Sequence, residues 1–372
     1  MNISFVSDSI YPYNKGGKEK RLYELSKRLA MMGHEVHIYT MHWWESPEKT
    51  RLEDGLRLHA ISKYRDMYKG DRRSTKSSIL FALACFKLWK TKFDVIDVDH
   101  MPYFPLFSMW LICSVRHRKM YGTWHEALTV KDWTDYMGKG GYLASLIEKL
   151  SVRLPYKIIS SSAHTKSLLE SVHGRKKGVA LITPGIDIEF IKSIPPASVK
   201  CDVLYAGRLV KDKNVDELIR AIKLLVSDKP DIKCIIIGHG PEKARLAKLI
   251  DKLELSGHIS LLDPLPEAKG VYAYMKATKT FCLASVREGF GMAALEALVC
   301  NTPVITIDSP ANAATNLIEP SVNGSIVPLD GSKIAEAITY WLEKAPKLNM
   351  ADQFTKYDWN TLAREQERVY SV

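Results

Sequence analysis

Short apolar runs alternate with amphipathic stretches along the first half of the chain. The apolar runs predict buried strands at 2–7, 36–40, 95–98, 119–123, 157–161 and 179–182. Between the first two runs, helical spacing is kept by Leu22, Leu25, Leu29 and Met32, and Gly33 follows as a helix-ending residue. A strand, a glycine loop, a helix and a second strand in this order predict a doubly wound α/β domain.

A second series with the same alternation begins at Cys201. Strands are predicted at 201–206, 232–237 and 280–284, and helices from Val215 onward and at 292–299. A stiff polar stretch at 194–198, which contains Pro195 and Pro196, separates the two series and is the predicted hinge. Because a chain of 372 residues seldom forms one core, we expect two domains, at 1–194 and 200–358.

Helices are also predicted at 79–90 and 142–153 in the first half. The stretch 79–90 carries one apolar stripe followed by lysines: Leu80, Leu83, Ala84 and Leu88, then Lys87, Lys90 and Lys92. Such a stripe either faces the core or lies on a membrane surface. The longest apolar run, at 103–115, is too short to span a bilayer and predicts a buried or interfacial helix.

Charge is distributed unevenly. The chain has a net charge of +11, and residues 1–192 carry 31 Lys and Arg against 20 Asp and Glu, so the remainder is neutral. Basic residues cluster at 63–76, 116–119 and 175–177. This half either binds an acidic partner, such as an anionic membrane surface, a lipid phosphate or nucleic acid, or it serves only solubility. The aromatic and basic strand pattern of a nucleic-acid reader is missing, so we expect no nucleic acid as partner.

Cysteine usage and the first residues bear on the compartment. The six cysteines have neither paired nor metal-ligand spacing, and most of them lie in apolar runs, so we predict reduced core residues. No signal-peptide pattern precedes the strand at 2–7. We therefore expect a cytoplasmic protein.

The most informative stretch is 280–299, which predicts a strand, a glycine turn and a helix start. The free N–H groups of a first helical turn and the helix dipole favour a phosphate there, and Gly289 and Gly291 allow a ligand to approach the backbone. The carboxylates of Glu288 and Glu296 flank this anion site, and carboxylates accept hydrogen bonds from paired hydroxyls. The spacing fits a binding site for sugar, diphosphate and ribose, or a surface helix with solvated acids.

Three further sets of residues follow predicted strands. The loop after 201–206 places Arg208 and Lys213 where two cations can neutralise a diphosphate without a metal, or can be solvated. His125 follows the strand at 119–123, at the edge where open α/β sheets bind ligands, although a lone histidine there is often structural. Gly16 and Gly17 follow the first strand and alone predict only a turn.

These motifs together resemble the retaining GT-B glycosyltransferases of family 4. Glu288-Gly289-Phe290-Gly291 followed by Glu296 is similar to the family's E-x7-E signature. Further similarity lies at 207–214, at Gly238-His239-Gly240-Pro241 and at 300–305, and extends over most of the chain. Departures from the family pattern are Asn214 and Asn301 in place of glycines, the Asp263-Pro264 pair, and the loop at 309–314, where the family commonly has two glycines.

The resemblance implies two Rossmann-like domains facing across a cleft, with a C-terminal helix at 359–372 returning to the first domain. It implies that Glu288 contacts the donor sugar, Glu296 the ribose, and the backbone at Phe290, Gly291 and Met292 the diphosphate and sugar. It further implies that Arg208 and Lys213 bind the diphosphate, that Gly16 and Gly17 approach the donor phosphate or the acceptor, and that His125 lies beside the donor sugar.

The expected reaction is transfer of a sugar from a nucleotide-diphosphate sugar to an acceptor hydroxyl with retention, with no metal and no cofactor. The basic first half favours a lipid-linked or anionic glycan acceptor of cell-envelope glycan or glycolipid synthesis, and peripheral binding at the inner membrane face. Two alternatives stay open: a GT-B sugar-nucleotide epimerase, which converts the donor without an acceptor, and a non-catalytic nucleotide-sugar-binding protein.

Overall fold

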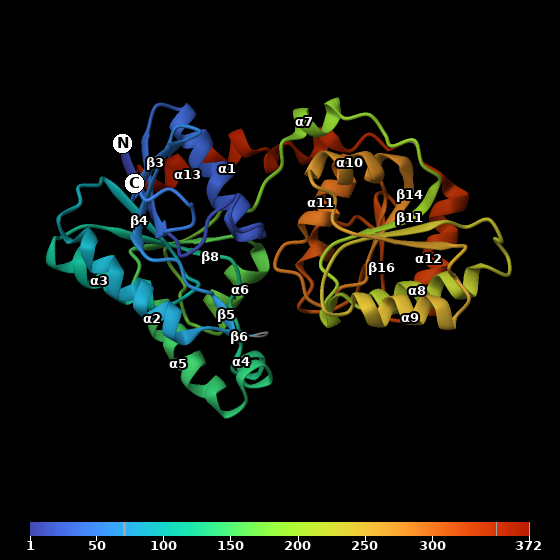
Figure 1. Cartoon of the computed structure of the whole chain (residues 1–372), viewed down its shortest axis with the longest axis horizontal. Helices are drawn as coiled ribbons and strands as arrows, with labels where there is room; N and C mark the ends of the chain where they lie inside the picture. Colours follow the sequence, from blue (N-terminus) through green and yellow to red (C-terminus); the bar gives the residue numbers. More distant parts are fainter. Residues whose placement is uncertain (70–71, 347, 372) are drawn as a thin grey trace. The chain divides into compact units, whose positions relative to one another are not determined.

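The computed structural model describes residues 1–69, 72–346 and 348–371. The chain forms two compact units, Met1–Gly185 with Trp359–Val372, and Ile186–Asp358 (Figure 1). The division therefore lies between Gly185 and Ile186, before the predicted hinge at 194–198. Ile186 belongs to the second unit because its N–H donates to the carbonyl of Tyr357, and Ile188 and Ile191 are buried in that unit's core.

The first unit is built on an eight-stranded sheet of order β10-β9-β8-β7-β1-β2-β4-β3. All neighbouring strands are parallel except β3, which is antiparallel to β4 at the edge. The strands are β1 (Asn2–Val6), β2 (Glu35–Met41), β3 (Thr50–Glu53), β4 (Leu56–Ser62), β7 (Val95–Asp99), β8 (Met120–Trp124), β9 (Lys157–Ser160) and β10 (Val179–Leu181). A separate antiparallel pair consists of β5 (Tyr68–Lys69) and β6 (Arg72–Arg73).

Helices cover both faces of this sheet and bury two separate cores (Figure 1). On one face, α1 (Gly17–Met31) packs beside α13 (Trp359–Tyr370), so the C-terminal helix belongs to the first unit as expected. The other face is covered by α2 (Thr75–Ala84), the 3-10 helix η1 (Cys85–Lys90), α3 (Phe104–Val115), α4 (Val130–Met137), α5 (Gly141–Ser151) and α6 (Ala163–Ser171). The short η2 (Gly138–Gly140) joins α4 to α5.

The second unit has a fully parallel six-stranded sheet of order β13-β12-β11-β14-β15-β16. The strands are β11 (Cys201–Ala206), β12 (Cys234–Ile237), β13 (Ile259–Leu262), β14 (Thr278–Leu283), β15 (Val304–Ile307) and β16 (Gly324–Val327). The helices are α7 (Ile188–Ser193), η3 (Lys211–Lys213), α8 (Val215–Leu225), α9 (Lys243–Lys252), α10 (Ala268–Ala277), α11 (Met292–Val299), η4 (Ala313–Leu317), α12 (Gly331–Lys344) and η5 (Ala351–Tyr357).

Both sheets have a topological switch point, where the strand order reverses. In the first unit, successive strands run outward from β1 on one side and from β7 on the other. In the second unit, they run outward from β11 and from β14. Ligands of doubly wound sheets bind beyond the carboxyl ends of the strands at such points. The two switch points are therefore where functional residues are expected.

The predicted stripe at 79–90 is confirmed only in part. Leu88 is buried and Ala84 packs against the core, but Leu83 is 57% exposed, and Phe81 and Cys85 reach the core instead. Phe81, Cys85 and Leu88 keep helical spacing, so the buried face is rotated from the predicted one. The six cysteines are free and buried, as predicted. Among the described residues, no helix is both long enough and apolar enough to cross a membrane.

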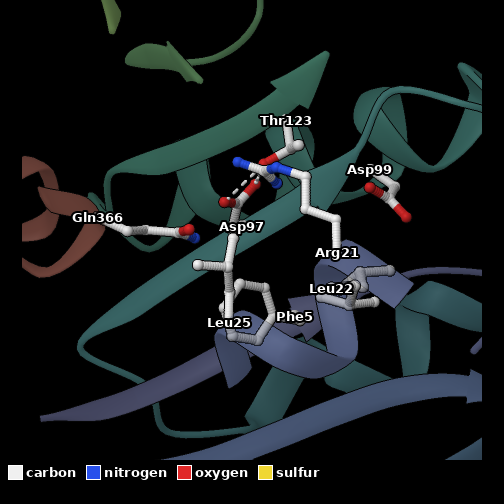
Figure 2. Close-up of a pocket in the computed structure, with 9 residues that line it drawn as sticks. Phe5, Arg21, Leu22, Leu25, Asp97, Asp99, Thr123 and Gln366 are labelled. Atoms are coloured by element: carbon white, nitrogen blue, oxygen red, sulfur yellow. Dashed lines mark hydrogen bonds between the residues drawn. The ribbon is translucent and has the colours of Figure 1, made fainter. Parts of the chain in front are cut away.

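The C-terminal helix is fixed to the first unit by a buried polar cluster. The Tyr370 hydroxyl donates to Asp97 Oδ2 at 2.6 Å, and Gln366 Nε2 donates to the Tyr370 hydroxyl at 2.5 Å. Thr123 also donates to Asp97, and Figure 2 shows this pair beside the Arg21 guanidinium, above an apolar wall that includes Phe5. Burial raises the pKa of Asp97 to about 6, against the hydrogen bonds from Tyr370 and Thr123.

Candidate active site

The turn between β14 and α11 has the geometry expected of a ligand-binding helix start. Gly291 precedes α11 with φ +92°, and a Cβ there would lie 2.5 Å from Ala314 Cβ, so the position requires glycine. α11 begins at Met292 as predicted, with its first N–H groups at the carboxyl edge of the sheet. Phe290 is partly buried, and its ring contacts Tyr357 edge-on at 5.6 Å between centroids.

The Glu288 backbone is fixed by a neighbouring loop. Its N–H donates to the Ala311 carbonyl at 3.0 Å, and its carbonyl accepts from Ala313 at 2.9 Å. The buried Asn312 holds that loop, because its side chain donates to the Ile307 carbonyl at 2.7 Å and accepts from the Ala314 N–H at 3.1 Å. Asn312 lies in the stretch that departs from the family's pair of glycines, and no sequence pattern pointed to this role.

Lys213 and Glu288 form an ion pair at this turn. Lys213 Nζ lies 2.6 Å from Glu288 Oε1, and the two side chains are 16% and 14% exposed. Asn214 follows in the left-handed region with φ +45°, and its side-chain amide donates to the Ala284 carbonyl at 3.2 Å. Asparagine therefore takes the positive φ at the position where the family pattern has glycine. The structure thus joins the loop after β11 to the loop after β14.

Arg208 and Glu296 complete the predicted set in the second unit. Arg208 is exposed in the loop after β11, where its carbonyl accepts from the Tyr205 hydroxyl at 2.8 Å. Glu296 lies on α11 and accepts a 2.9 Å hydrogen bond from the Tyr272 hydroxyl. Tyr272 is buried on α10 and orients this carboxylate. It was missed because the contact crosses between two helices.

In the first unit, Gly16 and Gly17 lie at the start of α1, beyond β1. A Cβ at Gly16 would lie 2.2 Å from a Glu19 carboxylate oxygen, whereas a Cβ at Gly17 would have nothing within 4 Å. The close approach at Gly16 is therefore to the chain itself. Gly17 leaves open space at the helix start, as a bound ligand would require.

Lys18, the residue after the two glycines, was not singled out from the sequence. Its ammonium lies 3.2 Å from Asp8 Oδ1 and 3.3 Å from Asp99 Oδ2, and it donates to the Met101 carbonyl at 3.0 Å. Burial opposes the charge, but the two carboxylates outweigh it and raise the pKa of Lys18. Arg73 pairs with the other oxygen of Asp8. Two cations and two carboxylates therefore meet at this switch point.

His125 lies at the same edge, beyond β8. Its Nε2 lies 2.9 Å from Asp99 Oδ1, and because a carboxylate only accepts, Nε2 carries the proton. Burial lowers the pKa of His125, with Asp99 opposing, so the imidazole is neutral. Burial disfavours charge on Asp99 as well, but Lys18, His125 and Ser7 outweigh it and hold the pKa of Asp99 below its usual range. Asp99 thus orients His125.

The predicted residues therefore fall into two groups, one in each unit. Arg208, Lys213, Glu288 and Glu296 surround the switch point between β11 and β14, together with the turn at 290–292. Gly16, Gly17 and His125 lie at the switch point between β1 and β7. Within 1–69, 72–346 and 348–371, no cluster of three His, Cys, Asp or Glu side chains is arranged to hold a metal ion.

Family models match both halves of the chain. Residues 15–190 match the model described as Glycosyltransferase Family 4, and residues 187–358 match the model described as Glycosyl transferases group 1. Together they extend over both units and include all the predicted site residues.

Curated relatives align over nearly the whole chain. A phosphatidylinositol N-acetylglucosaminyltransferase component of Homo sapiens is 26% identical, over 99% of this chain and 75% of its own length. The D-inositol 3-phosphate glycosyltransferase of Thermobispora bispora is 22% identical, over 96% of this chain and 90% of its own length.

Solved structures share the fold. The sucrose-phosphate synthase of Thermosynechococcus elongatus superposes with a TM-score of 0.82 at 18% identity, over 100% of this chain and 98% of that one. Anabaena Alr3699/HepE, in complex with UDP-glucose, gives a TM-score of 0.75 at 19% identity, over 100% of both chains.

Proposed function

The chain belongs to the family 4 glycosyltransferases of group 1 and has their GT-B fold, and we propose that it transfers a sugar from a nucleoside-diphosphate sugar to an acceptor hydroxyl with retention of the anomeric configuration. The observation that carries the proposal is the Lys213–Glu288 pair beside the start of α11. It brings a cation, a carboxylate and an anion-binding helix terminus together at one switch point.

In the proposed donor complex, the diphosphate binds to Arg208, to Lys213 and to the N–H groups of the first turn of α11. These groups stabilise the negative charge that develops on the leaving nucleotide, so no metal is required. Glu288 accepts hydrogen bonds from the sugar hydroxyls, and Glu296, oriented by Tyr272, accepts them from the ribose. The nucleotide must share Lys213 with Glu288, which couples diphosphate binding to sugar binding.

His125 acts beside the donor sugar in this proposal. Its Nε2–H is held by Asp99, which leaves Nδ1 as a hydrogen-bond acceptor. A neutral imidazole held in one orientation suits contact with a sugar hydroxyl. The acceptor attacks the face that the leaving group departs from, and a phosphate oxygen of the leaving group takes the acceptor's proton. The anomeric carbon–oxygen bond to the phosphate breaks as the new glycosidic bond forms.

For the acceptor, we propose a lipid-linked or anionic glycan. The excess of basic residues through Lys192 supports an anionic partner. The names of several relatives also support it, because they contain phosphatidylinositol, D-inositol 3-phosphate or phosphatidyl-myo-inositol. An acceptor of this class would belong to glycolipid or cell-envelope glycan synthesis.

The test is turnover of UDP-, GDP- and ADP-sugars with phosphatidylinositol or polyprenyl-phosphate acceptors in the presence of EDTA. Proton NMR of the product should show the donor's anomeric configuration, and Glu288→Gln should lose most of the activity. Glu343→Gln, on the exposed side of α12, is the matched control and should behave as wild type. Product with the opposite configuration, an obligatory metal, or isomerised donor in the absence of acceptor would refute the proposed reaction.

A further inference from the structure

Exposed apolar side chains concentrate on one helical layer of the first unit. Among the described residues of the second unit, the exposed large hydrophobic side chains are scattered: Phe190, Leu224, Val322, Leu329 and Tyr340. The first unit exposes many more, and most of them lie on the helices that cover the sheet face opposite α1 and α13. Soluble monomers seldom expose apolar side chains in such concentration.

The segment formed by α2 and η1 contributes an apolar stripe on its solvent side. Ile79, Leu83, Phe86 and Trp89 are 41%, 57%, 38% and 41% exposed, at successive spacings of four and three residues. The opposite side of this segment is the one that packs into the core. The stripe is thus a second apolar face, which packing within the unit does not explain.

The neighbouring α3 repeats the pattern. It packs beside α2 and η1, and its Trp110, Leu111 and Val115 are 42%, 42% and 56% exposed. Because both segments lie in one layer against the same sheet face, their outer sides face the same solvent (Figure 1). Two tryptophans are therefore at the surface of this layer, and tryptophan is enriched where proteins meet the bilayer interface.

On α5 the exposed side chains Tyr142, Leu143, Leu146 and Leu150 again follow helical spacing, and Lys149 is exposed between them. The buried contacts of α5 lie in the same core as those of α2 and α3. We call the outer surface of α2, η1, α3 and α5 the apolar layer.

The charge of the apolar layer is of one sign. The only acid within α2, η1, α3 and α5 is Glu148, which is fully buried. Lys76, Lys90 and Lys149 are exposed on these helices. Lys92, Arg118, Lys119 and Arg153, also exposed, follow within four residues of a helix end, and one exposed acid, Asp94, does so as well. Helices that combine leucine, tryptophan and lysine without an exposed acid, flanked mostly by lysines and arginines, complement an anionic lipid surface.

We propose that the apolar layer docks onto an anionic lipid bilayer, with Leu83, Trp89, Trp110 and Leu143 entering the interface and the surrounding lysines and arginines contacting lipid phosphates. The inference deepens the proposed function, since a bilayer would hold a lipid-linked acceptor in reach, but membrane docking does not depend on catalysis. The rival occupant of this surface is a second copy of the chain. The basic charge disfavours it, because two such surfaces would repel each other, and the test below separates the two outcomes.

The test is sedimentation of the full chain with phosphatidylcholine vesicles, alone or mixed with an equal part of phosphatidylglycerol, at low and at about 0.5 M salt, a concentration that screens surface charge. Binding is expected to the mixed vesicles at low salt and to weaken strongly with salt. Leu83→Gln with Leu143→Gln should lower the partition constant about tenfold or more. Lys90→Gln with Lys92→Gln should lower it roughly tenfold or more as well.

The matched control pairs Leu224→Gln with Lys248→Gln, both exposed on helices of the second unit, and should partition as wild type does. Nucleotide-sugar binding, measured by thermal shift, should be the same in all of these variants, so a failed donor site and a failed membrane site give different results. The inference is overturned if the mixed vesicles retain no protein, if both control and layer variants bind as wild type, or if the layer variants instead dissociate a dimer.

Discussion

Lys213 Nζ lies 2.6 Å from Glu288 Oε1, and this pair joins the loop after β11 to the loop after β14. The two residues are proposed to bind different parts of the donor, the diphosphate and the sugar. In the structure they neutralise each other in a mostly buried position. Binding of the diphosphate therefore redistributes an existing ion pair, and substitution of either residue changes the charge of the other's surroundings.

The first prediction concerns this pair. Lys213→Ala should lower kcat/KM on the order of 100-fold, since it removes a cation from the leaving group and leaves Glu288 with an uncompensated charge. The effects of Lys213→Ala and Glu288→Ala should not add in the double variant, because the two side chains are in contact. Steady-state kinetics of the three variants test this. Lys211→Ala, in the same 3-10 helix but exposed, is the control, and equal losses from Lys211 and Lys213 would contradict the assignment.

The second prediction concerns Tyr272, whose hydroxyl holds Glu296 at 2.9 Å. Tyr272→Phe removes one hydrogen bond and keeps the buried ring, so we expect donor affinity to fall roughly fivefold with little change in kcat. Calorimetric titration with the donor and with the free nucleoside diphosphate measures the change, which should appear in both since both carry the ribose. Tyr274→Phe on the same helix should have no effect. A loss confined to kcat would place Tyr272 outside the ribose site.

The third prediction separates orientation of His125 from mere packing. Asp99→Asn removes the charge that holds Nε2–H, so we expect kcat to fall on the order of tenfold. The acidic limb of the pH profile of kcat should move to lower pH, because His125 loses the partner that favours its protonation. Ser7→Ala removes the hydroxyl's hydrogen bonds with Asp99, Ser9 and Lys18 but no charge, and should leave the profile in place. An unchanged profile in Asp99→Asn would mean that His125 does not titrate in the rate-limiting step.

The fourth prediction concerns stability and the buried Glu148. Burial raises its pKa to about 7, although Trp133 Nε1 and the Leu128 N–H donate to it. The folded protein thus binds a proton that the unfolded chain has released between about pH 4.5 and pH 7, so this residue makes stability fall as pH rises through that window. Glu148→Gln stays neutral and should lose this dependence. Urea unfolding gives the free energy of unfolding of Glu148→Gln minus that of wild type at each pH. This difference should be higher at pH 8 than at pH 5 by about 1 kcal/mol or more. Equal differences at the two pH values would mean that Glu148 is ionised throughout.

Much of the fold follows from local patterns. The strand Cys201–Ala206 and the helix Met292–Val299 have the predicted bounds, and the C-terminal helix begins at the predicted residue, Trp359, because the apolar residues mark each of these elements clearly. The β3–β4 hairpin went unpredicted, although Asp54-Gly55 between two alternating runs is a strong hairpin signal and both residues have positive φ. The stripe at 79–90 was assigned to the wrong face because this segment carries apolar residues on two faces, and helical spacing alone does not select the buried one.

The candidate site was predicted where its residues lie in one loop or follow one strand. Glu288, Gly291 and Lys213 belong to such local motifs, and the structure gathers them at one switch point. Lys18, Asp99 and Tyr272 act through contacts between segments far apart in the chain, and no spacing within a single sequence encodes those contacts. Asn312 bonds within its own loop, but that loop pairs with the distant backbone of Glu288. The same holds for the apolar layer, since exposure of a hydrophobic stripe depends on which face of the helix the sheet takes.

Donor binding by the second unit's switch point is tested most directly by thermal unfolding with UDP-, GDP- and ADP-sugars in the presence of EDTA. A ligand that binds the folded state raises the midpoint by mass action. We predict that one of these donors raises the midpoint of the wild type and of Lys211→Ala, and that Lys213→Ala and Glu296→Ala abolish the shift. If no nucleotide sugar shifts the wild-type midpoint, or if the shift survives in Lys213→Ala and Glu296→Ala, the proposed donor site is contradicted.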